Sequence, residues 1–239
     1  HEVIAPPYDV INAKEARDLA KGRPNSFLHI SRPEIDLEEN IQYNDPSVYE
    51  TGKQNLRKMI EDDVLIEDSE DMIYLYEMID NDIHQLGIAA VSSVEAYEEN
   101  LIKRHEFTKP DKELDRVNNI SSLNAQTGPV LLTYRDNEKL SSLLEMISDR
   151  ESPLYDVKSI DGISHRIYQV NQFEEQREIL NLINSMDALF IADGHHRSAA
   201  AAVVKQNRQA KNSQHTGQES YNYFLTVSFP ESQMKILDY

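Results

Sequence analysis

The chain has 239 residues, of which 42 are acidic and 24 basic, and its net charge is −18 at pH 7. This length can bury a core without disulfides or a structural metal, in one large domain or two small ones. So acidic a surface repels phosphate backbones and anionic lipids, which argues against nucleic-acid and membrane-surface partners. The absence of cysteine excludes disulfides, thiolate metal sites and cysteine nucleophiles in this chain.

The sequence contains no apolar run near 18 residues, so we expect no membrane-spanning helix. A chain without cysteine fits a reducing compartment, and we expect a cytoplasmic protein. The chain begins at His1 rather than Met and ends at Tyr239 just after an apolar stretch. We therefore expect the natural sequence to continue at both ends.

Capping residues mark the helices in the first half of the chain. Asn12 with Glu15 predicts one helix start, Asp45 before Pro46 a second, and Thr108, acting as a cap, a third. We expect helices near 13–21 and 46–61 and from 110 onward, a strand at 26–30, and a β-hairpin of 72–79 and 84–91.

Turn signals divide the second half of the chain. Gly128-Pro129 predicts a break in the chain that is followed by a strand, and Asp161-Gly162 predicts the turn of a second hairpin. We expect strands at 130–134, 188–192, 221–229 and 234–237, helices at 138–147, 173–186 and 196–207, and a hairpin of 154–160 and 163–170.

Two hairpins with helices between strands predict an α+β fold with a mixed, largely antiparallel sheet, rather than a doubly wound parallel sheet. No shift in composition marks a domain boundary. We therefore treat residues 1–239 as a single α+β unit. A division into 1–100 and a phosphate-binding part at 101–239 is the alternative.

The sequence A-D-G-H-H-R predicts a strand, a tight turn and a helix. Gly194 permits a backbone geometry that a side chain would hinder, and the first helical turn offers N–H groups and a positive dipole to an anion such as phosphate. His195, His196 and Arg197 add donors. Asp193 is placed to hold Mg²⁺ or to accept a proton from a substrate hydroxyl. The alternative is that Asp193 only caps the helix and the histidines are ordinary residues.

A second cluster, K-R-H-E-F-T-K, is a basic island in an acidic chain, and Arg116 follows it after one helical stretch. Its cations would attract an anionic substrate, and Glu106 could act as a base or as a metal ligand. We assign His105, Thr108 and Arg116 to phosphate or nucleotide binding. In the alternative interpretation the island is a solvated loop, and its charge pairs contribute little to stability.

A third cluster, A-P-P-Y-D-V, lies near the N-terminus. Its two prolines hold Tyr8 and Asp9 in a rigid extended segment. The tyrosine could stack on a ring, and the aspartate could bind polar groups of a substrate. Arg32, which follows a predicted strand, is a third candidate for substrate binding. The alternative is a structural N-terminal arm.

Together the three clusters resemble a bacterial and archaeal family of unknown function, number 1015. Its members look alike in an A-P-P-Y-D-V segment, an H-E-x-T segment followed by D-R, and an A-D-G-H-H-R segment. These stand here at 5–10, at 105–108 with 115–116, and at 192–197. Members typically continue beyond the point where this chain ends, so the resemblance implies a further C-terminal part.

The last motif is also similar to the nucleotide-contacting turn of the ParB and sulfiredoxin superfamily, in which Gly-x-x-Arg opens a helix and holds phosphate. Free serine kinases of that superfamily carry a comparable D-G-H-H-R stretch. The resemblance implies a ParB/sulfiredoxin-like strand–turn–helix within the α+β fold. Reduction of sulfinic acids needs a cysteine in this turn and is excluded, and the charge of −18 argues against binding DNA as ParB does.

The leading hypothesis is a nucleotide-dependent phosphotransferase acting on a small molecule, with ATP or ADP and with Mg²⁺ held by Asp193 and Glu106. Either carboxylate could be the base. Free serine is the substrate that the superfamily resemblance implies. Two alternatives stay open, a non-catalytic regulator that binds a nucleotide or metabolite and an interaction protein without a ligand. The sequence also leaves the oligomeric state open.

Overall fold

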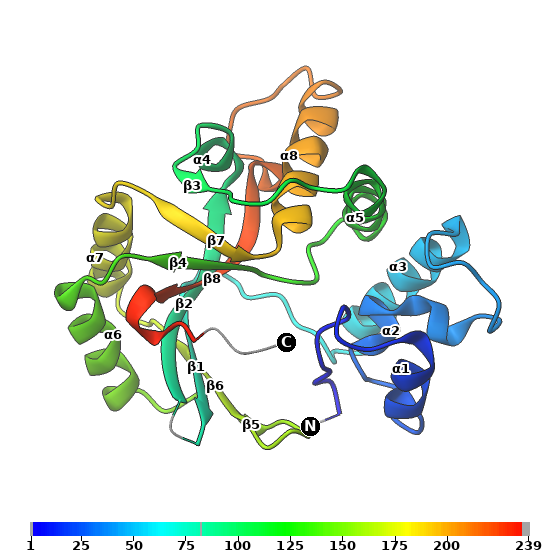
Figure 1. The fold of residues 1–239 in the computed structure, drawn as a ribbon, viewed down its shortest axis with the longest axis horizontal. Helices are drawn as coiled ribbons and strands as arrows, with labels where there is room; N and C mark the ends of the chain where they lie inside the picture. The colour runs from blue at the N-terminus through cyan, green and yellow to red at the C-terminus, as the bar shows by residue number, and fades with distance from the viewer. Residues whose placement is uncertain (1, 82, 236–239) are drawn as a thin grey trace. The chain divides into compact units, whose positions relative to one another are not determined.

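The computed structural model describes residues 2–81 and 83–235. The chain divides into two compact units, His1–Ser69 with Lys109–Gly128, and Glu70–Thr108 with Pro129–Tyr239. The first unit is helical and the second contains the sheet, so the α+β class is confirmed (Figure 1). Among the described residues, no helix is long and apolar enough to cross a membrane.

The first unit is built from helices whose starts the sequence marks. Asn12 accepts hydrogen bonds from the backbone of Lys14 and Glu15, both at 3.0 Å, and the Glu15 carboxylate accepts one from the Asn12 backbone at 2.8 Å. This capping box confirms the first predicted helix start. The helices are α1 (Ala13–Ala20), α2 (Leu28–Ser31), α3 (Pro46–Glu61) and α5 (Pro110–Leu123), with a 3₁₀ turn at Pro33–Asp36.

Two predictions in this unit are wrong. Residues 26–30 form no strand, because the chain takes one helical turn there and buries both Leu28 and Ile30 completely. A short apolar run fits either structure, and here packing decides. Thr108 is not the cap of α5, since Lys109 occupies that position, where its side chain makes no capping hydrogen bond. Pro110 supplies the start instead, because its fixed φ suits the first helical residue.

The second unit contains an eight-stranded mixed sheet in the order β3-β7-β4-β8-β2-β1-β6-β5. The pairs β3–β7 and β4–β8 are parallel and the other pairs antiparallel, so both predicted hairpins, β1–β2 and β5–β6, are confirmed. The strands are β1 (Tyr74–Asp80), β2 (Ile83–Ser93), β3 (Ile102–Lys103), β4 (Val130–Tyr134), β5 (Tyr155–Lys158), β6 (Ser164–Gln169), β7 (Leu189–Asp193) and β8 (Tyr223–Pro230).

Two details of the predicted strands differ from the structure. Met234 and Lys235 are not in a strand, and the rest of the strand predicted at 234–237 lies outside the described residues. Residue 82, within the predicted turn of the first hairpin, also lies outside them. The sequence did not predict β3 or the helix before it, α4 (Val94–Glu98), because both are too short to show a period.

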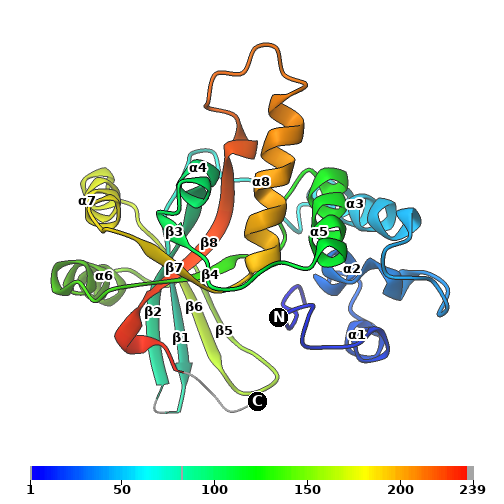
Figure 2. The same ribbon diagram turned by 45° about the horizontal axis from the view of Figure 1, so that its top comes forward.

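The sheet unit has two hydrophobic clusters. One joins β1 and β2 to α6 and α7, and the other joins β4, β7 and β8 to α4 and α8. In both views α6 and α7 lie next to each other, and α8 runs beside β8 (Figures 1 and 2). These helices are α4 (Val94–Glu98), α6 (Glu138–Arg150), α7 (Phe173–Asn184) and α8 (His195–Gln209).

A buried carboxylate contacts Tyr168 of the first cluster. The side chain of Glu77, on β1, is 9% exposed and accepts hydrogen bonds from Tyr168 at 2.8 Å, His84 at 2.6 Å and Arg166 at 3.3 Å. Burial alone would raise the pKa of Glu77, but these three partners outweigh it and hold the pKa below its usual value. The ionised group therefore stabilises the fold above the unfolded-state pKa, and this contribution is lost as pH falls through the lower folded pKa.

Replacing Glu77 with Gln is expected to lower the free energy of unfolding at pH 7 by about 1–3 kcal/mol, because the charge-assisted hydrogen bonds weaken. The difference from wild type should shrink below about pH 4. Urea titrations at several pH values measure both effects. Asp156→Asn is the matched control, since Asp156 also accepts from Arg166, at 3.0 Å, but its side chain is 52% exposed. If Asp156→Asn lowered the free energy of unfolding as much as Glu77→Gln, the role of burial would be contradicted.

Candidate functional site

The predicted strand, turn and helix are present as β7, Gly194 and α8. Gly194 has φ +97° and is the N-cap residue of α8. A Cβ atom at Gly194 would lie 3.2 Å from the Val130 Cα and 3.2 Å from the Arg197 Nε. Both the positive φ and the close backbone of β4 therefore require glycine. Because the turn is this tight, α8 begins directly where β7 ends.

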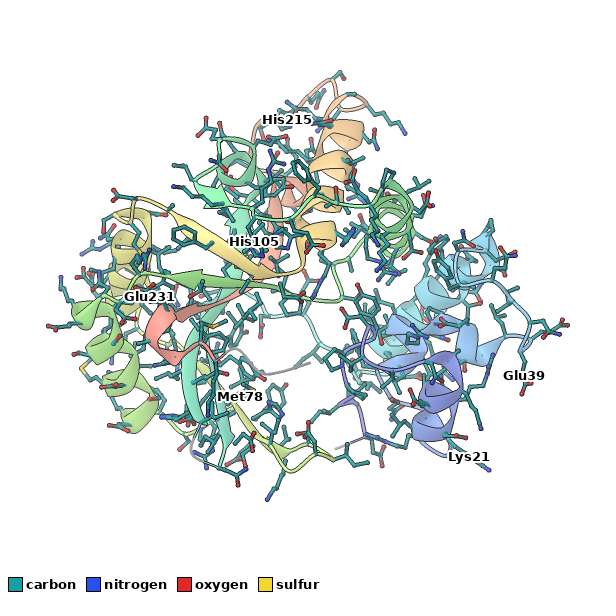
Figure 3. All side chains as sticks on the ribbon, in the orientation of Figure 1. Lys21, Glu39, Met78, His105, His215 and Glu231 are labelled. Carbon is teal, nitrogen blue, oxygen red and sulfur yellow. The ribbon has the colours of Figure 1, made fainter. Side chains whose placement is uncertain are left out.

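His195 is the first residue of α8 and is 5% exposed. Its Nε2 atom accepts a hydrogen bond from the backbone N–H of His105 at 3.4 Å, and the two imidazole rings meet edge to face with centroids 4.5 Å apart. His105 lies near the start of α8 in Figure 3. The turn motif and the basic island, which are 90 residues apart, are therefore in direct contact.

The hydrogen bond at Nε2 leaves the proton of neutral His195 on Nδ1. The Nδ1 atom lies 3.7 Å from the Glu106 Oε2. Burial lowers the pKa of His195 and His105 lowers it further, while the Glu106 and Asp193 carboxylates oppose the shift. The net effect lowers the pKa, so His195 is neutral at pH 7 and faces a carboxylate.

Asp193 and Arg197 pair across the turn. The Arg197 guanidinium donates to the Asp193 carboxylate at 2.5 Å and also to the Pro129 carbonyl oxygen. The Asp193 side chain is 65% exposed and that of Arg197 is 17% exposed. The arginine therefore holds the turn and β4 together, and its carboxylate partner remains open to solvent.

A pocket of about 490 Å³ lies beside His195. Four of the predicted site residues share it, namely His105, Glu106, Thr108 and His195. Sequence reasoning missed Tyr97 and Asn100. Asn100 has a left-handed φ of +61°, a conformation that asparagine tolerates in turns. The residue type itself was therefore the one sequence signal for a turn at this position. The complete lining is Tyr97, Asn100, Arg104, His105, Glu106, Phe107, Thr108 and His195.

Four further predicted site residues belong to the first unit, namely Tyr8, Asp9, Arg32 and Arg116. Arg32 donates to the Tyr8 carbonyl oxygen at 3.2 Å, and the Arg116 guanidinium lies 4.5 Å from the centroid of the Tyr8 ring. Arg116 also pairs with the Asp115 carboxylate. Asp9 is exposed. The A-P-P-Y-D-V and D-R segments therefore meet through Tyr8, Arg32 and Arg116.

Within residues 2–81 and 83–235, no three His, Asp or Glu side chains are arranged to hold a metal ion. Mg²⁺ commonly binds one or two carboxylates together with substrate phosphates. The two carboxylates predicted to hold it, Asp193 and Glu106, both act electrostatically on His195.

A family model described as a protein of unknown function, DUF1015, matches residues 1–239. The chain belongs to the DUF1015 family. No curated protein and no solved structure is similar enough to match it. The DUF1015 description names no activity, so the chemistry of this member is argued from its own side chains.

Gly194→Ala is expected to destabilise this DUF1015 protein by about 1–3 kcal/mol more than Gly217→Ala. Both glycines have positive φ, +97° and +89°, but a Cβ at Gly217 meets nothing within 4 Å. Both substitutions therefore lose free energy of unfolding because alanine is strained at positive φ. The additional loss at Gly194 comes from the contacts of the new Cβ with Val130 and Arg197. Denaturant unfolding measures it, and equal losses would show that β4 does not constrain the turn.

Glu106→Gln is expected to lower the pKa of His195 further, because the carboxylate that stabilises the imidazolium is lost. A pH titration of the imidazole resonances by NMR measures the shift, and wild-type His195 should titrate below pH 6.5. Glu98→Gln is the control, since Glu98 pairs with Lys205 at 2.6 Å. An unchanged or raised pKa in Glu106→Gln would contradict the described geometry.

Proposed function

We propose that this DUF1015 protein is a nucleotide-dependent phosphotransferase acting on a small molecule. A carboxylate, Glu106, lies 3.7 Å from a nearly buried neutral histidine at the first residue of a helix, and this observation carries the proposal. It combines a positive helix end, suited to a phosphate group, with a base for a substrate hydroxyl in one pocket.

The phosphate group would bind at the turn from Asp193 to Arg197. Backbone N–H groups at the start of α8 and the helix dipole favour an anion there, and His196 adds a donor. Arg197 already donates to Asp193 and Pro129, but a guanidinium has five N–H groups and can share them with phosphate oxygens. The resemblance to the D-G-H-H-R stretch of free serine kinases, within the ParB and sulfiredoxin superfamily, supports the same placement.

Glu106 suits the role of base better than Asp193. Asp193 is ion-paired with Arg197 at 2.5 Å, so its carboxylate is already engaged by the guanidinium. His195, whose Nδ1 lies 3.7 Å from the Glu106 carboxylate, is neutral at pH 7. In the proposed step the substrate hydroxyl attacks the terminal phosphorus, the bond to the bridging oxygen breaks, and the proton passes to Glu106.

ATP or ADP is the proposed donor, and Mg²⁺ would neutralise charge on the transferring group. Asp193 would hold the ion together with phosphate oxygens. Glu106 is the second candidate ligand, because it and Asp193 are the two carboxylates that raise the pKa of His195. Free serine is the acceptor that the resemblance suggests. Tyr8, Asp9, Arg32 and Arg116 remain proposed ligand-binding residues of the first unit.

Saturating nucleotide with Mg²⁺ is expected to raise the unfolding midpoint by about 5–10 °C, since a ligand at a hundred times its Kd adds about 2.7 kcal/mol. Glu106→Gln should keep this shift and lose about 10²–10⁴-fold in phosphotransfer to hydroxyl compounds. Thermal unfolding and product analysis measure the two effects separately.

Arg197→Lys should reduce the nucleotide shift, because lysine cannot make the same forked contacts. Arg208→Lys, the same exchange in the last turn of α8, is the control. No shift with any nucleotide would overturn the proposal. A shift without turnover on any hydroxyl compound would instead identify a regulator that binds a nucleotide and does not catalyse.

A further inference from the structure

Arg104 lines the pocket and is held in place by an aromatic side chain. Its guanidinium carbon lies 5.1 Å from the centroid of the Tyr97 ring, and its Nη1 donates to the Tyr97 hydroxyl at 3.2 Å. Tyr97 is itself 5% exposed and packs edge to face on Phe224. The cation–π contact and the hydrogen bond fix the position of a flexible side chain on a rigid base.

Arg104 has no carboxylate partner among the residues that the structure describes. In a chain with 42 acidic and 24 basic residues, an exposed arginine has many possible partners. Arg150, for example, pairs with both Glu151 and Glu175. A fixed guanidinium without a carboxylate, at the wall of a pocket, is suited to bind an anionic group of a ligand.

The position of Arg104 along the chain limits the size of that ligand. Glu106 is two residues further on, so the two Cα atoms are at most about 7 Å apart. Both side chains line the same pocket. A molecule whose hydroxyl faces Glu106 and whose anionic group meets Arg104 therefore has to fit within this one pocket of about 490 Å³.

We propose that Arg104 is a specificity-determining residue that binds an anionic group, a carboxylate or a phosphate, on the phosphoryl acceptor. This inference rests on the proposed function in one respect, namely that the bound molecule is the acceptor of the phosphoryl group. Tyr97 is a positioning residue, because it acts only through the guanidinium it holds. The nucleotide phosphates are assigned to the turn at Gly194, of which His195 is the residue that lines this pocket.

The test uses three probes that differ in one group, glycerate, glycerol 3-phosphate and glycerol. The full chain is titrated with each, up to about 50 mM, and the side-chain Nε–H resonance of Arg104 is followed by NMR. At least one anionic probe should shift this resonance with saturation, and glycerol should not. Whether glycerate or glycerol 3-phosphate binds more tightly distinguishes a carboxylate from a phosphate ester.

Arg104→Met should weaken binding of the preferred anion at least about 10-fold, as expected for a lost charge-assisted hydrogen bond. Lys211→Met removes one positive charge at an exposed position outside the pocket lining and should leave the affinity unchanged. Tyr97→Phe keeps the ring and loses the hydroxyl, so it should weaken binding by a smaller factor and reduce the anion-induced shift of the Arg104 resonance.

Equal responses to glycerol and to both anions, or no response of Arg104 to any probe, would overturn the inference. So would an Arg104→Met variant that loses nucleotide binding and keeps the affinity for the anion. The titrations with glycerate, glycerol 3-phosphate and glycerol need neither a nucleotide nor turnover. Failure of the phosphotransferase proposal would therefore leave the anion site standing, and phosphotransfer to an anionic acceptor that is unaffected by Arg104→Met would remove only the anion site.

Discussion

The left-handed turn at Gly194 is the constraint on which the sheet unit depends. It lets α8 start directly after β7 while the β4 backbone passes within 3.2 Å of the position a Cβ would occupy. The alanine-rich face of α8 can then pack into the cluster beneath it, where Ala199, Ala201 and Ala202 are nearly fully buried. The same turn fixes His195 as the first helical residue. Packing and site geometry therefore share one backbone conformation.

The order of segments along the chain explains why neighbouring motifs separate. After β3 the chain passes through the loop with Arg104 and Glu106, leaves the sheet unit at Thr108, builds α5 in the first unit, and returns at Pro129 to form β4. The H-E-x-T and D-R segments are close in sequence yet belong to different units. Each unit thus gathers its own set of motif residues, around His195 in one and around Tyr8 in the other.

Local signals predicted those elements whose ends are determined locally. The caps at Asn12 and Asp45 specified α1 and α3, because a side chain satisfies the first N–H groups of each helix. The segment at Leu28 misled the prediction, since tertiary burial selects a helical turn from an apolar run that fits a strand equally well. The strand order was beyond prediction, because β3 is only two residues long and gains its partner through the fold.

The candidate site was partly predictable for a similar reason. His105, Glu106 and His195 stand in recognisable motifs, and the structure brings them together. Tyr97 and Asn100 have no motif, and only the packing of α4 brings them to the pocket. The network around Glu77 was missed as well, since a single acid in an apolar strand looks unfavourable until its cross-strand partners are known.

The shortness of β3 has a consequence for the histidine. Two paired residues, Ile102 with Leu189 and Lys103 with Phe190, join this outermost strand to the sheet. Such an edge opens by local unfolding at little cost compared with the centre of the sheet. The backbone donor to His195 follows two residues later, so each opening hydrates the imidazole and restores part of its basicity. A ligand that keeps the edge closed would slow amide exchange there and hold the histidine neutral.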